Sequence, residues 1–398
     1  MEALTHFAPY TGWVYPNETV IEWSVLIVVY PYLTGLVAGA FTVSSLYQVF
    51  GFERLKPVAH LALLSSLCAM IFVPIPLLLH LGHPERAFNS TITPHLTSAM
   101  AVFGYFATFY IVLLLIETWF AYRTYFVEQA QRRQGLLGRA YRVLTLGSYD
   151  VSENAMRYDA KWIFYLALLG IPGAHGLHGY AGFVFGSLKS REWWSSDLMP
   201  VIFLFSAIIS GVSLLVVLYV ASCKLRKVTI DEACVKGLAY TIWGFIMVAL
   251  LLEGLEFANL VYKGREGVEV IMEFVTGRLL VPYFILQFAI GSIFPLLLLS
   301  WMIWRKTTGR ALIIGVTTCA CLVMFSVFMM RWNVVIGGQE ISKTGKGLLT
   351  YNMLTFGREG WILAACVLFA PLFGLIGLSR FLPPFEHGPH TAAVTSAR

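Results

Sequence analysis

The sequence predicts an all-α fold, a polytopic transmembrane helical bundle of about nine spans. Of the 398 residues, 58% are hydrophobic and 13% are charged, whereas roughly 25% of the residues in a typical soluble domain are charged. The mean hydropathy is +0.72. The apolar residues form continuous runs, not the alternating pattern of a β-barrel. This composition excludes a soluble enzyme, a nucleic-acid-binding protein and a disordered scaffold.

Nine apolar segments are long enough to cross the membrane, because about 20 helical residues span roughly 30 Å of hydrocarbon. They cover residues 22–48, 57–80, 97–121, 162–187, 199–222, 237–262, 279–303, 310–336 and 359–380. We interpret residues 22–187 as a first four-helix bundle and residues 188–336 as a second. Residues 337–398 then form an outer loop, an additional transmembrane helix and a cytoplasmic tail. In the first segment, Gly35 and Gly39 form a small-xxx-small pair that allows a neighbouring helix to approach closely.

The distribution of basic residues predicts the orientation, because cytoplasmic loops carry an excess of Lys and Arg. The loops on one side of the nine segments hold eighteen of these residues and the other loops hold nine. The basic side is therefore predicted to be cytoplasmic, with the N-terminal arm (residues 1–21) outside and the C-terminus inside. Residues 122–161 form a long cytoplasmic loop, interpreted as a surface helix or a partner contact. The tail, residues 382–398, has a composition typical of disorder.

The sixth segment carries Glu253, Glu256 and Asn259, which recur every three residues and share one helix face. Polar side chains in hydrocarbon are costly and often mark functional sites. One interpretation is structural, a hydrogen-bonded pair or a salt bridge to Arg331 in the eighth segment. We favour the other, a carboxylate pair that carries protons or lies beside a quinone. A buried Arg331 needs a partner, and Glu253 or Glu256 is the natural candidate.

The fourth segment carries two histidines beside a predicted break. Pro172 and Gly173 are expected to interrupt the helix, and His175 and His178 follow on one face. Two histidines in this position favour a binding site over simple packing. Ligation of a b-type haem is an alternative, because it needs histidines on facing helices. His60, the other deep histidine, is a poor match in depth.

The outer end of the second segment places His80, His83 and Arg86 at the membrane interface. Interfacial anchoring is one interpretation, and polarisation of a bound carbonyl group is the other. Tyr30 and Tyr32 lie deeper in the first segment and are candidates for stacking on a ring. The six cysteines form no CxxC pair and are interpreted as small core residues, so we expect no metal site.

Several of these segments resemble the NrfD/PsrC-type membrane subunits of respiratory complexes. That family includes the polysulfide reductase anchor, HybB-like hydrogenase subunits and the integral subunits of alternative complex III. The resemblance is carried, in order, by EWSVLIVVYPYLTGLVAGAF, LHLGHPERAFN, TPHLTSAMAVFGYF, IPGAHGLHGYAG, LQFAIGSIFPLLLL and RWNVVIGGQ.

The resemblance implies a multi-pass subunit of the cytoplasmic (inner) membrane of a bacterium or archaeon, without haem or metal of its own. It implies that menaquinone or another quinone binds near the outer face, within the first four helices. Electrons would pass between this quinone and an extracytoplasmic iron–sulfur (ferredoxin-like) subunit. Further catalytic or multihaem cytochrome subunits would complete the assembly, surrounded by membrane lipids.

The resemblance also suggests roles for individual residues. Tyr30 lies where the polysulfide reductase anchor has a quinone-contacting histidine, and His80 lies where many members have an aspartate. The residues predicted to bind the quinone are Tyr30, His80, His83, Arg86 and His175. The predicted proton path consists of His178, Glu253, Glu256, Arg331 and, closer to the cytoplasm, Glu117.

Two other functions stay open at this point. A secondary transporter also uses paired intramembrane carboxylates and broken helices, although the two halves show no convincing self-similarity. A purely structural anchor without a ligand is the other.

Overall fold

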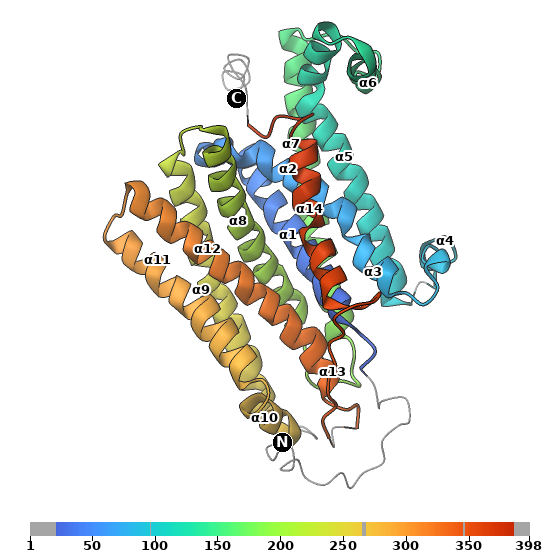
Figure 1. Cartoon of the computed structure of the whole chain (residues 1–398), viewed down its shortest axis with the longest axis vertical. Coiled ribbons are helices and arrows are strands. Elements are labelled where there is room, and N and C mark those ends of the chain that lie inside the picture. The colour runs from blue at the N-terminus through green and yellow to red at the C-terminus, as the bar shows by residue number, and fades with distance from the viewer. Residues whose placement is uncertain (1–20, 96, 265–267, 345–346, 386–398) are drawn as a thin grey trace.

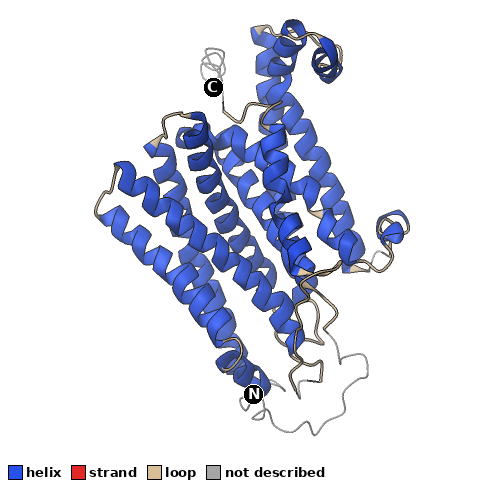
Figure 2. Ribbon diagram, viewed as in Figure 1, coloured by secondary structure: helices blue, strands red, loops and turns tan. Residues whose placement is uncertain are grey.

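The computed structural model describes residues 21–95, 97–264, 268–344 and 347–385, and these form a bundle of long helices (Figure 1). The described residues contain no strand, and a single bridge joins Ile341 to Leu348 (Figure 2). The all-α prediction is therefore confirmed. The predicted N-terminal arm, apart from residue 21, lies outside the described residues, as does most of the predicted disordered tail.

The helices follow one another with short connections. In chain order they are α1 (Val25–Gln48), η3 (Glu53–Leu55), α2 (Lys56–Phe72), α3 (Pro74–His80), η4 (Pro84–Arg86), α4 (Asn89–Ile92), α5 (Ala99–Arg132), α6 (Gly135–Leu144), α7 (Glu153–Gly186), α8 (Met199–Arg226), α9 (Glu232–Lys263), α10 (Val268–Thr276), η5 (Leu280–Ile293), α11 (Phe294–Trp304), α12 (Gly309–Trp332), η6 (Asn333–Gly337), α13 (Gly338–Glu340) and α14 (Trp361–Leu378). η3 and η4 are short 3₁₀-helices, whereas η5 and η6 have the wider π-helical turn. π-Helical turns are rare and are frequently found at functional sites.

Eight helical segments among the described residues are long and apolar enough to span a membrane. They correspond to all the predicted spans except the fourth, which lies within α7. The two histidines, the proline and six glycines make α7 less apolar, but it packs within the bundle against α1, α5 and α8.

α7 is continuous through Pro172 and Gly173, so the predicted break was wrong. The nearby Gly170 instead gives close packing, because a Cβ there would lie 2.3 Å from Cζ of Phe41. Neighbouring helices can stabilise a proline inside a membrane helix without interrupting it.

α1 and α8 cross at the centre of the bundle (Figure 1). They join the first half of the bundle, residues 22–187, to the second half, residues 188–336. A Cβ on Gly39 would lie 2.2 Å from the carbonyl oxygen of Ala207, and one on Gly211 would lie 2.5 Å from Cα of Gly39. The close approach predicted at Gly39 is therefore confirmed. Gly35, one turn away, leaves room for the ring of His178, whose Cε1 would lie 3.2 Å from an added Cβ.

The Gly211→Ala substitution is expected to lower the thermal unfolding temperature, because the added methyl group clashes with the α1 backbone. Overpacking of this kind costs about 1–3 kcal/mol. Gly254→Ala on α9 is the matched control, because an added Cβ there meets nothing within 4 Å. Unfolding of both variants in detergent can be followed by circular dichroism. Equal unfolding temperatures would contradict a tight crossing at Gly211.

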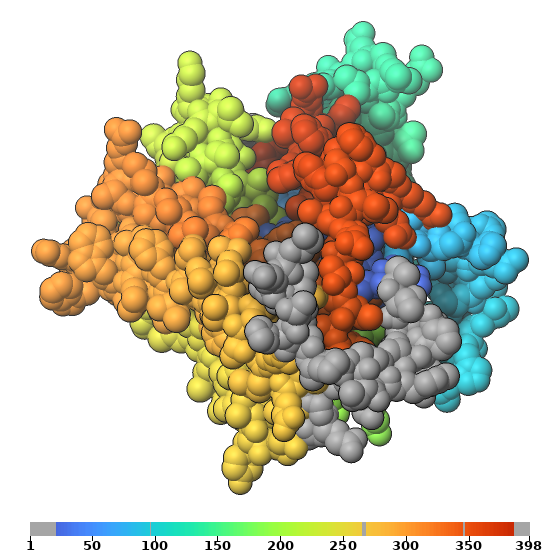
Figure 3. All heavy atoms as spheres, turned by 60° about the horizontal axis from the view of Figure 1, so that its bottom comes forward, coloured from blue at the N-terminus to red at the C-terminus, as the bar shows by residue number. Residues whose placement is uncertain are grey.

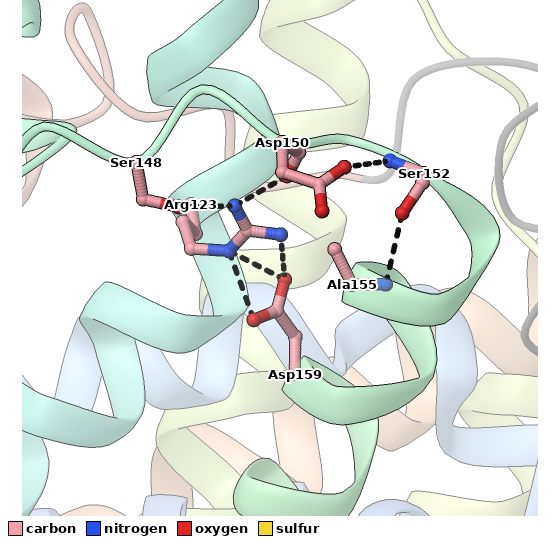
Figure 4. A network of polar contacts seen from close by, with 6 residues as sticks. All are labelled: Arg123, Ser148, Asp150, Ser152, Ala155 and Asp159. Atoms are coloured by element: carbon pink, nitrogen blue, oxygen red, sulfur yellow. Dashed lines mark hydrogen bonds and ion pairs between the residues drawn. The ribbon is translucent and has the colours of Figure 1, made fainter.

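The predicted cytoplasmic loop at 122–161 is largely helical. α5 and α7 extend into it, and α6, which follows α5 in the chain, packs against α5 as the predicted surface helix (Figure 1). Arg123 on α5 and Asp159 on α7 form a buried ion pair, with 2.7 Å between Nη2 and Oδ2 (Figure 4). Arg123 also donates to the carbonyl oxygen of Asp150 at 2.7 Å. The Ser152 backbone N–H donates to the Asp150 carboxylate and lowers the pKa of that group.

The first residues of the predicted disordered tail are ordered against the bundle, so the prediction was wrong for residues 382–385. Leu382 is buried, and the hydroxyl of Tyr122 donates to the carbonyl oxygen of Pro383 at 2.8 Å. The ring of Phe385 packs edge-on against Tyr219 at 6.0 Å. These apolar side chains find partners that composition alone does not reveal. Residues 386–398 lie outside the described residues.

Candidate functional site

Two neighbouring cavities lie in the second half of the bundle. The first, about 570 Å³ including its open part, is enclosed by α8, α9, η5 and the junction of α12 with η6. The second, about 340 Å³, lies between α8, α9, η5 and α12. Glu253 and Met330 line both cavities. A carboxyl group therefore stands where the two spaces adjoin.

Glu253 is the first member of a hydrogen-bonded chain along one wall of the first cavity. Nε2 of Gln287 donates to Oε2 of Glu253 at 2.8 Å. Nδ2 of Asn333 donates to Oε1 of Gln287 at 2.8 Å and to the carbonyl oxygen of Pro282 at 3.2 Å. Gln287 comes from η5 and Asn333 from η6, so π-helical segments supply both amides. The sequence interpretation missed Gln287, although a lone glutamine in an apolar segment was the available signal.

Arg331 is fully buried and binds groups from α7 and α8. Its Nη2 donates to Oγ of Ser206 at 2.6 Å and contacts Nε2 of His178 at 2.9 Å. Its Cζ lies 3.8 Å from the centroid of the Phe203 ring, a cation–π contact. The predicted salt bridge to Glu253 or Glu256 was wrong, because the guanidinium turns toward α7 and α8.

Four polar side chains form a row across the bundle, which we call the polar row: Glu253, Ser206, Arg331 and His178. Ser206 lines the second cavity opposite Glu253 and also binds Arg331, which in turn contacts His178. One turn away on α7, His175 has Nδ1 2.6 Å from the carbonyl oxygen of Ile171. Polar groups therefore continue from the first cavity to α7 at the centre of the bundle.

Glu256 and Glu117 both lie outside the polar row, but in different places. Glu256 lines the first cavity, and its Oε2 has no hydrogen-bond partner among the described residues. Glu117 is buried on α5, and within the described part of the chain neither of its oxygens has a hydrogen-bond partner. The structure therefore brings Glu253, Glu256, Arg331 and His178 into one region and leaves Glu117 apart from their hydrogen bonds.

The residues predicted to bind the quinone are distributed over the first half of the bundle. Tyr30 is buried on α1, and its ring packs edge-on against Phe103 at 5.5 Å. His80 ends α3, with Nδ1 3.0 Å from Oε1 of Glu359. His175 has its Nε2 3.4 Å from Oγ1 of Thr42.

His83 and Arg86 lie on the loop that follows α3, which is predicted to be outside, with side chains 68% and 67% exposed. Each is close to Glu85, at 2.9 Å and 3.9 Å. In the described parts of the chain, none of the five predicted quinone residues hydrogen-bonds another or lines either cavity. Figure 3, turned to bring the predicted outer end forward, shows the α3–α4 region and the α10–α12 region on opposite sides.

No group of three or more His, Cys, Asp or Glu residues that could hold a metal ion occurs in the residues that the structure describes. The absence of haem and metal from this chain stays a prediction.

Known proteins of similar sequence include subunits named for reductases and for a menaquinol oxidoreductase. A family model described as "Polysulphide reductase, NrfD" matches residues 14–342. A selenate reductase subunit of Mesobacillus selenatarsenatis is 30% identical over 322 residues, covering 79% of this chain and 73% of that protein. An Hdr-like menaquinol oxidoreductase integral membrane subunit of Archaeoglobus fulgidus is 26% identical, covering 59% and 52%. Protein NrfD of Escherichia coli is 24% identical, covering 80% and 95%.

Proposed function

Because this chain belongs to the NrfD polysulphide reductase family, we propose that it is the quinone-linked integral membrane subunit of a respiratory oxidoreductase complex. It exchanges electrons between menaquinone or another quinone and an iron–sulfur subunit docked at the predicted outer end. The name of the Archaeoglobus relative, a menaquinol oxidoreductase subunit, supports the quinone. Further catalytic or cytochrome subunits then connect the iron–sulfur subunit to the final donor or acceptor.

The quinone head group is bound near the outer ends of the first four spans. His80 is the residue best placed for this role, because Glu359 lies beside its Nδ1 and leaves Nε2 free for a quinone oxygen. Tyr30 and His175 are the further hydrogen-bonding residues, and either side chain can bond a carbonyl oxygen. His83 and Arg86, which are exposed on the outer loop, contact the partner subunit or a charged intermediate.

Quinone chemistry moves protons with electrons, and the polar row from Glu253 to His178 provides the proton route. This row of polar side chains is the observation that carries the proposal. Glu253 can take up and release a proton, and the second cavity between Glu253 and Ser206 provides space for bridging water. His178 accepts from the Arg331 guanidinium at Nε2, so its own hydrogen is on Nδ1. Arg331 fixes the orientation of His178 through a 2.9 Å contact. Protons taken up from the cytoplasm, with electrons exchanged outside, would contribute to the membrane potential.

The Glu253→Gln substitution is expected to lower quinone-linked turnover of the whole complex by about 100-fold, the usual scale for loss of a proton-transferring group. Glutamine preserves the shape and hydrogen-bonding capacity of the side chain but cannot release a proton. Turnover is measured with a soluble quinol analogue and an artificial acceptor in membranes that contain the assembled complex.

The matched control for this experiment is Glu269→Gln on α10. Glu269 is exposed at the same end of the molecule and lines neither cavity. Turnover of Glu253→Gln equal to that of the control, at equal amounts of assembled complex, would rule out Glu253 as a proton carrier.

A further inference from the structure

The first cavity presents hydrogen-bond acceptors on an otherwise apolar wall. Asn333 lines it and is 1% exposed, and its Oδ1 has no hydrogen-bond partner among the described residues. Oε2 of Glu256, on the facing helix α9, is also without a hydrogen bond within the described ranges. An unsatisfied buried acceptor costs about 1–3 kcal/mol. Two of them at one cavity indicate a ligand that donates hydrogen bonds.

The Asn333 side chain can only accept a further hydrogen bond, because the donors of its amide are already used. Both hydrogens of the Asn333 amide have acceptors, in Pro282 and Gln287, and this network fixes which end of the amide faces the cavity. The Gln287 amide in turn donates to Glu253. The indole N–H of Trp193 donates to the backbone oxygen of Asn333 at 3.1 Å. A ligand that carries only acceptors could accept from the Tyr283 hydroxyl in the lining, but it would leave Asn333 Oδ1 and Glu256 Oε2 without a donor.

The remainder of the cavity suits a flat, lipophilic head group. Aromatic rings contribute to its wall, with Trp193 and Tyr283 packed edge-on at 5.8 Å and Phe257 beside Tyr283 at 6.4 Å. Met199, Ile202 and Leu260 complete the apolar part. A bare metal cation would meet the carboxylates but would gain nothing from these apolar side chains.

We infer that this cavity is a second binding site, selective for the hydroquinone form of a lipid quinone over the oxidised form. The two ring hydroxyls donate to Asn333 Oδ1 and to the Glu256 carboxylate, and the ring lies among the aromatic side chains. An oxidised quinone has only acceptor oxygens and cannot satisfy these groups. The inference rests on the proposed function and adds to it the redox form of the ligand and a location in the second half of the bundle.

The test measures binding of menadiol and of menadione to the purified full-length chain by anaerobic equilibrium dialysis. The Asn333→Leu variant is expected to bind menadiol roughly fivefold to tenfold more weakly at this site, with menadione binding unchanged. Asn259→Leu is the matched control, because Asn259 is exposed on the same helix as Glu256 and lines neither cavity. Glu256→Gln exchanges an acceptor for a donor. Its menadiol binding provides a second test if Asn333→Leu folds poorly.

Three outcomes overturn the inference. The first is equal menadiol binding by Asn333→Leu, Glu256→Gln and Asn259→Leu. The second is an equal loss of menadiol and menadione in the cavity variants, which would remove the selectivity. The third is displacement of menadiol by sodium or potassium chloride at constant ionic strength, which would identify a cation as the occupant. Failure of the unaltered chain to bind either form would overturn the proposed function as well.

Discussion

Replacement of Arg331 by glutamine is expected to lower quinone-linked turnover by about 100-fold or more. The shorter amide cannot reach His178 and Ser206 together, so their hydrogen bonds at 2.9 Å and 2.6 Å are lost. His178 then loses the donor that fixes its Nε2, and the proposed proton route between the second cavity and α7 is interrupted. Arg331→Lys keeps the charge but lacks the planar fork, and its activity should lie between those of glutamine and arginine.

The control experiments separate this effect from a general loss of structure. Arg278→Gln removes an arginine at the predicted outer end that donates to the carbonyl oxygen of Leu349 and lies outside both cavities, and it should retain activity. If Arg331 acts through His178, the double variant Arg331→Gln/His178→Gln should be no less active than Arg331→Gln. Independent, multiplying losses in the double variant would contradict this coupling. Turnover is normalised to the amount of assembled complex in each membrane preparation.

The sequence could predict the fold class and most helix positions, because both depend on the length of apolar runs. It also predicted the close approach at Gly39, since small residues one turn apart mark helix crossings in membranes. It failed at Pro172, where packing against neighbouring helices keeps α7 continuous. The π-helical turns of η5 and η6 also lay beyond prediction, since they depend on tertiary contacts and not on local propensity.

The candidate site was only partly predictable for a related reason. A membrane helix is apolar on its lipid-facing and its protein-facing sides, so the sequence gives little information on its rotation. The polarity of Arg331 and Glu253 marked both as functional candidates, but their partners depend on how α7, α8, η5 and α12 rotate. Arg331 therefore binds His178, and Glu253 binds Gln287.

The same structure changes how the two halves of the molecule are understood. The polar row starts in the second half at Glu253 and reaches His178 on α7, which belongs to the first half. α8 makes this connection possible. Its Ser206 contacts Arg331, and its Gly211 packs against α1 at the crossing. The glycine contact at the crossing thus brings the two halves close enough for the proposed proton route to serve the proposed quinone site in the first half.

The second large effect is expected at the end predicted to be cytoplasmic, where Asp159→Ala should destabilise the protein by about 3–5 kcal/mol. The side chains of Arg123 and Asp159 are 4% and 9% exposed, so removal of the carboxylate leaves a buried guanidinium without its counter-charge (Figure 4). Glu153→Ala breaks an exposed pair with Arg157 on the same helix and should cost about 0.5 kcal/mol or less. The double variant Arg123→Leu/Asp159→Leu, which removes both charges, should recover most of the lost stability. Reversible unfolding in mixed micelles measures all three variants, and equal losses for Asp159→Ala and Glu153→Ala would show that the buried pair contributes no more than a surface one.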